Sequence, residues 1–327
     1  MEYLYLEDYS NARSYFEKCL NEDEEDYSAL YNIIYCYDMC NESELAIPFL
    51  NEYIDKNPYC EVAWHQLGRQ YFMLDMFQEA LTAFDYAILI DESFIGGYLE
   101  KAKTLEELKL YKEAIDHYLI TLDLDDPTAF ALVRIGECYE KLHKYDAAIS
   151  YYKKAVHEDP LLDKAWVLIT NLYFTKENYQ KAAYYIAKAL KIDEDNPMYW
   201  RKYAEINLKL HLFEEVIIGY ENCLTLNDDD IAIYIGLVDI LLFLGDFNKA
   251  VSKLFKAQKI YKNFAEIEYR LAGVFFILNK EKFAKKHMID ALKIDFEYHS
   301  VLKELFPTLV ENPIIQKLIT DFKKGTD

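Results

Sequence analysis

The chain has 327 residues, and its 57 acidic and 36 basic side chains give a net charge of −21 at pH 7. Hydrophobic residues make up 52% of it, while glycine and proline occur only nine and seven times. This composition is ample for a large core and excludes a disordered, collagen-like or turn-rich all-β chain, so it favours helix. A pI near 4.8 without clustered basic residues also argues against nucleic acid and anionic membranes as partners, because the summed field repels polyanions.

The sequence has no feature of a membrane span or of a secretory signal. Its most apolar stretch, residues 231–244, is shorter than the ~20 residues that a spanning helix needs, and it contains Asp239. Residues 1–8 lack the basic start and apolar core of a secretory signal. Six cysteines are too few for a disulfide framework in a chain of this length, which fits a reducing compartment. We therefore expect a cytoplasmic protein.

A period of 34 residues organises most of the chain. Eight windows tile residues 27–298 without an insertion, beginning at Tyr27, Glu61, Ile95, Ala129, Asp163, Pro197, Ile231 and Ala265. Within each window the apolar residues fall mostly at positions 4, 7, 8 and 11, and then at 20, 24 and 27. Both sets advance by three or four residues, so each marks one face of a helix. The repeated unit is therefore predicted to be a helical hairpin.

In chain order, we expect a partial hairpin over residues 1–26, eight repeats over residues 27–298 and a helical cap over residues 299–327. The partial unit begins at the equivalent of position 9 of a first helix, so we expect the natural protein to extend upstream of Met1. In the cap, the pattern continues weakly until Pro307 interrupts it. A final amphipathic helix then follows over residues 312–322, because a terminal repeat must cover an apolar face that has no neighbour.

Position 20 of the window carries alanine in almost every unit. It reads Ala46, Ala80, Ala114, Ala148, Ala182, Val216, Ala250 and Ala284, with Ala12 in the partial unit. A site that accepts only a small side chain at constant spacing indicates that two helix backbones approach closely there. All three tryptophans, Trp64, Trp166 and Trp200, occupy position 4 and add bulk in register.

These residues resemble the tetratricopeptide repeat (TPR) family. The segments Trp64–Tyr71 (WHQLGRQY) and Ala80–Phe84 (ALTAF) carry its signature, and residues 136–160 repeat it closely. The resemblance implies an all-α, right-handed α-solenoid superhelix of tandem 34-residue hairpins, with a concave groove lined by the first helix of each hairpin. Residues 84–87 and 135–142 also resemble long cytoplasmic TPR proteins of Bacteroidetes-type bacteria.

No residue pattern in the sequence indicates catalysis, a cofactor or a metal. The seven histidines form no pair at i, i+4, and neither a phosphate-binding loop nor a nucleophile elbow is present. Cys36 and Cys40 lie one helical turn apart, and we expect both to fill the hairpin interior rather than to start a metal site. Acidic loops such as residues 22–26 and 228–230 are interpreted as helix caps, since a calcium loop would need a glycine at its sixth position.

We expect function on the groove, at positions 2, 5, 6, 9, 12 and 13 of each repeat. These 48 positions hold nine basic and nine acidic residues, so the rest of the chain carries the whole net charge. Repeats four to six contribute a local excess of cations, namely Arg134, Lys141, Lys164, Arg201, Lys202 and Lys209. Repeats seven and eight contribute apolar groove residues, among them Ile235, Leu242, Phe243, Tyr269 and Phe276. This pattern predicts a site for a peptide with acidic side chains beside an apolar anchor.

Two alternatives apply to these groove residues. The cations could instead form a solvated, internally salt-bridged face, and the apolar residues could be buried under the C-terminal cap or by the curvature of the superhelix. The predicted function is a non-catalytic scaffold that binds a partner protein or peptide. The alternative function is self-assembly as a homo-oligomer through the exposed terminal hairpin, where Tyr3 and Tyr9 would lack neighbours. An enzyme is the least favoured class, because the hairpins supply no pocket chemistry.

Overall fold

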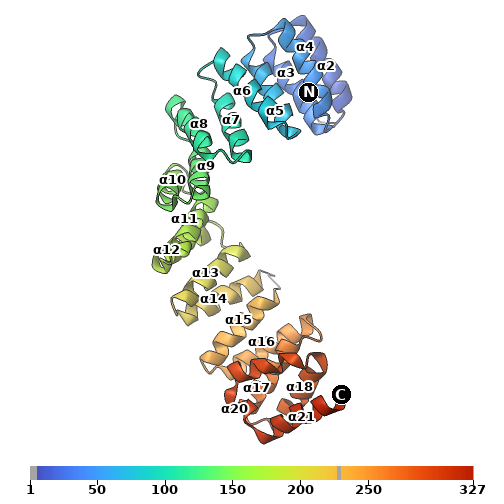
Figure 1. The fold of residues 1–327 in the computed structure, drawn as a ribbon, viewed down its shortest axis with the longest axis vertical. Helices are drawn as coiled ribbons and strands as arrows, with labels where there is room; N and C mark the ends of the chain where they lie inside the picture. Colours follow the sequence, from blue (N-terminus) through green and yellow to red (C-terminus); the bar gives the residue numbers. More distant parts are fainter. Residues whose placement is uncertain (1–5, 227–229, 327) are drawn as a thin grey trace. The chain divides into compact units, whose positions relative to one another are not determined.

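The computed structural model describes residues 6–226 and 230–326, and all regular secondary structure in these two ranges is helical (Figure 1). The predicted all-α solenoid of tandem hairpins is confirmed. Within the same ranges, no helix has both the length and the apolar character that crossing a membrane requires.

Each window of 34 residues holds two helices, an A helix followed by a B helix. The A helices are α3 (Tyr27–Met39), α5 (Glu61–Met73), α7 (Ile95–Glu107), α9 (Ala129–Lys141), α11 (Asp163–Thr175), α13 (Pro197–Lys209), α15 (Ile231–Phe243) and α17 (Ala265–Ile277). The B helices are α4 (Ser43–Lys56), α6 (Phe77–Ile90), α8 (Tyr111–Leu124), α10 (Tyr145–Glu158), α12 (Tyr179–Ile192), α14 (Phe213–Thr225), α16 (Phe247–Ile260) and α18 (Glu281–Ile294). Before them, α2 (Tyr9–Glu22) packs against α3.

Every A helix ends in the same tight turn. Its central residue adopts a positive φ at intervals of 34 residues: Asn41, Asp75, Lys109, His143, Glu177, His211, Gly245 and Asn279. In the first of these turns, the amide of Glu42 donates to the carbonyl of Tyr37 and that of Asn41 to Asp38. These two hydrogen bonds satisfy carbonyl groups that the end of a helix leaves free, and the turn reverses the chain into the B helix.

The recurring alanine lies where the helices pack closest. The nine residues at this position, including Ala12 and Val216, are at most 2% exposed. In the sixth repeat the approach is tightest one turn later, at Gly219. A Cβ there would lie 2.8 Å from the Cβ of Ala204 and 3.0 Å from the backbone oxygen of Trp200. Small side chains in the B helices therefore set the distance between the two helices of a hairpin.

The tryptophans at position 4 close the loops between hairpins. The indole N–H of Trp64 donates to the carbonyl oxygen of Pro58 at 3.0 Å, and Trp166 makes the equivalent bond to Pro160 at 3.0 Å. Asp26 caps the amide of Ala29 at the start of α3, which is the capping role predicted for the acidic loops. The side chain of Asp230 likewise caps the start of α15.

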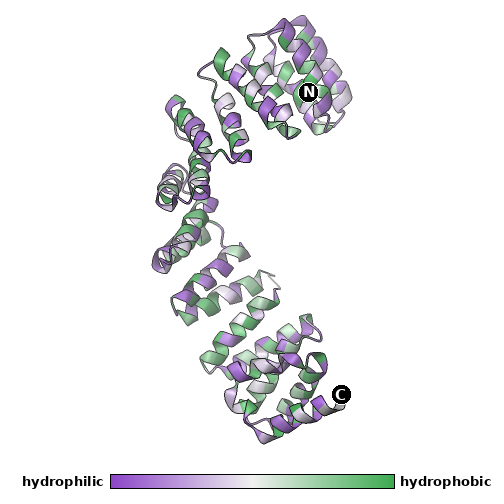
Figure 2. Cartoon of the chain, in the orientation of Figure 1, coloured by the Kyte–Doolittle hydropathy of each residue, from purple (hydrophilic) through white to green (hydrophobic). Residues whose placement is uncertain are grey.

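The chain divides into two compact units, residues 1–169 and residues 170–327. The first unit has buried clusters centred on α3 to α5 and on α7 to α9. The main cluster of the second unit extends from α15 through α18 to the C-terminal segment. The most apolar stretch of the sequence is α15, mostly green in Figure 2, and six of its thirteen side chains are buried in the core of this unit.

The C-terminal segment covers the last hairpin. It consists of a 3₁₀ turn (Glu297–Ser300), α19 (Val301–Leu305), α20 (Pro307–Val310) and α21 (Pro313–Thr326). Phe306 packs directly on Gly273 of α17, where a β-carbon would overlap its ring. The final helix continues beyond the predicted residue 322. Pro307 starts α20 instead of merely ending a helix, because the first helical position does not need an N–H donor.

Candidate partner-binding surfaces on the A helices

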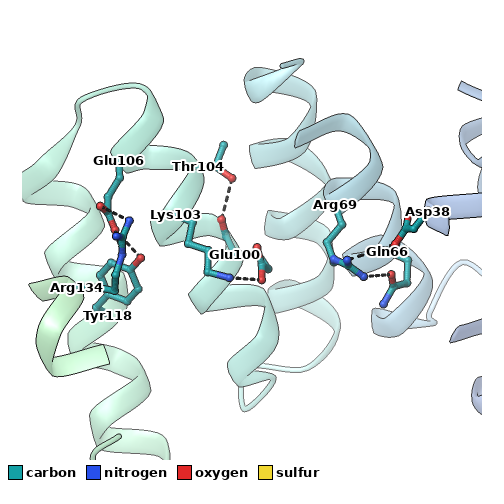
Figure 3. Close-up of polar contacts among 9 residues, drawn as sticks. All are labelled: Asp38, Gln66, Arg69, Glu100, Lys103, Thr104, Glu106, Tyr118 and Arg134. Atoms are coloured by element: carbon teal, nitrogen blue, oxygen red, sulfur yellow. Dashed lines mark hydrogen bonds and ion pairs between the residues drawn. The ribbon is translucent and has the colours of Figure 1, made fainter. Parts of the chain in front are cut away.

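The surface of interest is the A-helix wall, defined as positions 2, 5, 6, 9, 12 and 13 of each repeat. Within the first unit its charged residues pair with one another (Figure 3). Asp38 of α3 accepts from Arg69 at 3.4 Å and from Gln70 at 2.9 Å, both on α5. On α7, Lys103 pairs with Glu100 at 2.7 Å. The contacts of Asp38 connect α3 with α5, whereas the Lys103–Glu100 pair lies within α7.

Arg134 is the most firmly held of the predicted cations. Its Nε and Nη2 atoms bind the two carboxylate oxygens of Glu106 at 3.1 and 2.6 Å, and Nη1 binds Glu137 at 2.7 Å. The hydroxyl of Tyr118 also donates to Glu106 at 2.6 Å. Burial raises the pKa of Glu106, although Tyr118 and Arg134 oppose this rise by stabilising the carboxylate. With two carboxylates as partners, Arg134 fixes α9 against α7 and has little charge to offer a ligand.

The other two cations of the first unit differ in their environment. Lys164 pairs with Glu137 at 3.2 Å. Lys141 is exposed and makes no ion pair with any residue in the described ranges. It lies at the rim of an open pocket of about 480 Å³, lined by Glu106, Glu107, Lys109, Tyr111, Arg134, Glu137, Glu140, Lys141 and Leu168. Four glutamates face three basic residues there, so this pocket is not positively charged.

In the second unit, two of the three predicted cations are also engaged. Arg201 pairs with Asp230 at 2.8 Å. Lys202 pairs with Glu205 at 2.9 Å, and its amino group lies 4.0 Å from the ring centre of Phe174. Lys209, the last residue of α13, is exposed and has no ion-pair partner among the described residues.

Of the predicted apolar residues, Phe243 is the most accessible. It is 72% exposed at the end of α15, and its ring centre lies 4.9 Å from that of Phe213, which begins α14. Ile235, Leu242 and Phe276 are half-buried and pack against the core of the second unit.

Tyr269 is fully buried, so the sequence-based expectation that it lines an open groove is wrong. Its hydroxyl donates to the carbonyl oxygen of Asp295 at 2.7 Å, and its ring packs near that of Tyr298. The segment after α18 covers it, which is the burial alternative raised for this residue. Arg270, at the next position, is likewise buried. Its guanidinium group donates to the two carboxylate oxygens of Asp239 at 2.8 and 2.9 Å.

Family comparison assigns the fold that this geometry describes. Models of the tetratricopeptide repeat match residues 1–59, 129–160 and 163–196. These matches include the position-20 alanines Ala12, Ala46, Ala148 and Ala182. The three matched segments are therefore tetratricopeptide repeats.

Solved structures similar to this chain have low sequence identity to it. They include YrrB, described as a TPR protein with an unusual peptide-binding site (15% identity, 56% of this chain and 95% of that chain, TM-score 0.48). A tetratricopeptide repeat protein from Parabacteroides merdae matches at 16% identity over 79% of this chain and 97% of its own, with a TM-score of 0.47. The APC/C hetero-tetramer Cut9-Hcn1 matches at 17% identity over 81% of this chain and 52% of that chain, with a TM-score of 0.45.

The count of wall charges overstated the positive charge of repeats four to six. It omitted Asp230, which lies at position 34 of its repeat and reaches Arg201 from outside the wall. It also assigned Glu106 to the preceding repeat, although this carboxylate neutralises Arg134. For Arg134, Lys164, Arg201 and Lys202, the internally salt-bridged alternative therefore describes the TPR wall.

Cys36 is buried as expected, but Cys40 is exposed, because it caps the end of α3 instead of facing the core. Tyr3 lies outside the described residues, and Tyr9 is half-buried with its ring near Tyr35.

The sequence analysis missed an exposed row on α3, formed by Tyr27, Tyr31, Tyr35 and Met39. Their spacing of four residues was the available signal, because side chains at i and i+4 share one helix face.

Proposed function

We propose that this TPR protein is a non-catalytic scaffold, and that the wall of its second unit binds a peptide through an acidic side chain and an apolar anchor. The observation that supports this proposal is the exposure of Phe243, whose ring contacts Phe213 shortly after the free cation Lys209 in the sequence. Lys209 ends α13 only four residues before Phe213, whose ring contacts Phe243. Exposed aromatic residues beside unpaired charge are typical of the anchors of peptide complexes.

The charge of the second unit is compatible with an acidic ligand. Residues 170–327 carry 23 acidic and 22 basic side chains, a net charge of −1. A carboxylate approaching Lys209 therefore meets no strong opposing field. Arg201 and Lys202 contribute less, since each already has a carboxylate partner. Lys209 and Phe243 are the two residues on which the proposal depends.

Selection from a displayed random-peptide library tests this proposal. The wild-type protein is expected to enrich peptides that combine Asp or Glu with a large apolar residue. A selected peptide is then synthesised, and its affinity is measured by fluorescence polarisation against Lys209→Glu and Phe243→Ala. We expect each substitution to weaken binding by about tenfold or more, because each removes one anchor contact.

Matched controls lie in the same unit. Lys262→Glu makes the same charge change at another exposed lysine, and Ile218→Ala removes an exposed apolar side chain from α14. Both controls should retain wild-type affinity and helicity. Enrichment of no peptide, or equal losses in the controls and the test variants, would refute the site.

The alternative function is self-assembly through residues 1–26. Tyr15 in α2 is 61% exposed, which leaves an apolar side chain available on the terminal hairpin. Light scattering separates the two functions. A dimer that is lost on deletion of residues 1–26 would support assembly, and a monomer at every concentration would exclude it.

A further inference from the structure

The two units of this protein differ sharply in charge. Residues 1–169 hold 34 acidic side chains against 14 basic ones, a net charge of −20, whereas the second unit is almost neutral. The total charge of the chain therefore resides in the first unit. A strongly acidic surface attracts basic partners and raises their association rate, and it repels acidic ones. The acidic ligand proposed for the second unit cannot be the natural ligand of the first.

The first unit also carries a distinct exposed row, which we name the α3 stripe. It consists of Tyr27, Tyr31, Tyr35 and Met39, which follow one another at intervals of four residues and are 38–47% exposed. In the other seven repeats, at least one of the four equivalent positions is polar, charged or glycine. From Tyr27 to Met39 the stripe spans thirteen residues of helix, or about 18 Å at a rise of 1.5 Å per residue. That length suits an extended segment of about five or six residues.

Carboxylates lie near Tyr27 and Tyr31 of the α3 stripe, and the guanidinium of Arg69 also lies near Tyr31. Burial raises the pKa of Tyr27, and the nearby Glu61 and Glu25 carboxylates add to the rise. Asp38 lies on α3 beside the stripe, where Arg69 and Gln70 bind it. The 14 acidic and three basic residues among residues 1–60 make this the most acidic part of the chain. Tyrosine faces and carboxylates together favour a guanidinium or ammonium group, which stacks on the ring and pairs with the acid.

The same helix already binds an arginine in this way on another face. The guanidinium carbon of Arg13 lies 4.4 Å from the ring centre of Tyr37, and its Nη1 atom pairs with Glu42 at 2.8 Å. Arg13 belongs to α2, so an arginine from a neighbouring segment uses an aromatic ring and a carboxylate of this hairpin together. The stripe offers three further tyrosine rings without such an arginine above them among the described residues.

We propose that the α3 stripe binds a basic, arginine- or lysine-containing segment of a partner protein. The inference rests on the proposed function only in that the protein is a binding scaffold, because it uses another unit and a ligand of opposite charge. Cationic side chains of the segment would lie over Tyr31 and Tyr35, and its apolar residues would contact Met39. The field of the first unit would steer the segment to this surface.

A pair of designed peptides tests the proposal. One is a fluorescein-labelled twelve-residue peptide of Arg, Leu and Gly, and the other has Glu in place of each Arg. Fluorescence polarisation should show binding of the basic peptide alone, with an affinity that falls as salt is raised. The double variant Tyr31→Ser, Tyr35→Ser should bind the basic peptide about tenfold more weakly, although its net charge is unchanged.

Two control variants separate the stripe from general charge attraction. Tyr59→Ser changes a tyrosine outside the stripe that is 83% exposed, the highest value among the tyrosines that the structure describes, and it should bind as the wild type does. The double variant Tyr31→Phe, Tyr35→Phe keeps the rings and should retain most of the affinity. Equal affinity of the serine double variant and the wild type would overturn the proposal, as would preference for the acidic peptide or no binding of the basic one. Lys209→Glu and Phe243→Ala should leave the basic peptide unaffected, so failure of the site in the second unit is measured separately.

Discussion

At the scale of single residues, the turn after each A helix stores avoidable strain. Seven of the eight repeats place a residue with a side chain at the positive φ of this turn, and only the seventh uses glycine, Gly245. The left-handed conformation costs residues with a Cβ about 1 kcal/mol or more, whereas glycine adopts it freely. The turn nevertheless forms in every repeat, because its hydrogen bonds and the packing of both flanking helices over-determine it.

Glycine at this turn should therefore stabilise the protein. Glu177 has φ +55°, and its side chain is exposed and makes no hydrogen bond or ion pair within the described residues. We expect Glu177→Gly to raise the free energy of unfolding by about 0.5–1 kcal/mol. Gly245→Ala should lower it by about 1 kcal/mol through backbone strain alone, since a Cβ there meets nothing within 4 Å. Urea denaturation of both variants measures the changes, and the same sign for both would contradict the argument.

At the scale of elements, successive hairpins meet through contacts that mix ion pairs with buried polar groups. His65 of α5 is one such buried polar group, and its burial costs folding free energy. It is 9% exposed, its ring lies near those of Phe84 and Phe94, and neither ring nitrogen has a hydrogen-bond partner in the described part of the chain. Burial lowers the pKa of His65 to about 4, with Glu100 opposing the shift and Arg69 and Lys103 adding to it.

The neutral form of His65 is the one that the fold accepts, so stability should depend on pH. Below the usual histidine pKa of about 6.5 the unfolded chain binds a proton that the folded one refuses. The contribution of His65 to the free energy of unfolding is then fully present above pH 6.5. It falls by up to about 3 kcal/mol as the pH drops towards 4. His65→Leu should remove that contribution. Denaturation at pH 7 and pH 4.5 should show a smaller loss in the variant, and equal losses would exclude His65 as the cause.

At the scale of the whole molecule, the chain forms two units, and within each unit the helices contact mainly their neighbours in the sequence. Helices adjacent in the chain, such as α9 and α10 or α17 and α18, make the most extensive contacts. In a repeat protein of this kind, stability is a sum of repeat and nearest-neighbour terms, so no distant element is needed to fold a given hairpin.

Removal of one repeat should therefore shorten the protein without unfolding it. We expect deletion of residues 129–162, which comprise α9 and α10, to give a soluble protein with an unchanged mean residue ellipticity in circular dichroism. The position-20 alanines on either side, Ala114 and Ala182, keep their spacing within their own hairpins. Aggregation or loss of helicity would show that the hairpins depend on more distant contacts.

The sequence by itself determined the helical hairpin, its period and its tight contacts. Position 20 and the 3–4 residue spacing are local patterns, and a 34-residue repeat leaves one arrangement that buries both apolar faces. The same pattern could have located the strained turn, because His143 and Glu177 follow the last A-helix residue at a fixed distance. The α3 stripe was also readable from its spacing.

Only the tertiary structure decided which wall residues are free. Arg134 and Arg201 are paired by carboxylates from a neighbouring hairpin or loop, and Tyr269 is covered by the C-terminal segment. These partners lie 26 to 29 residues away along the chain. Some of them are not wall positions, and Glu106 belongs to the wall of another repeat, so a count of wall charges in repeats four to six leaves them out. The periodicity of a helix reports which face a side chain occupies, but the charge and exposure of that face depend on what packs opposite it.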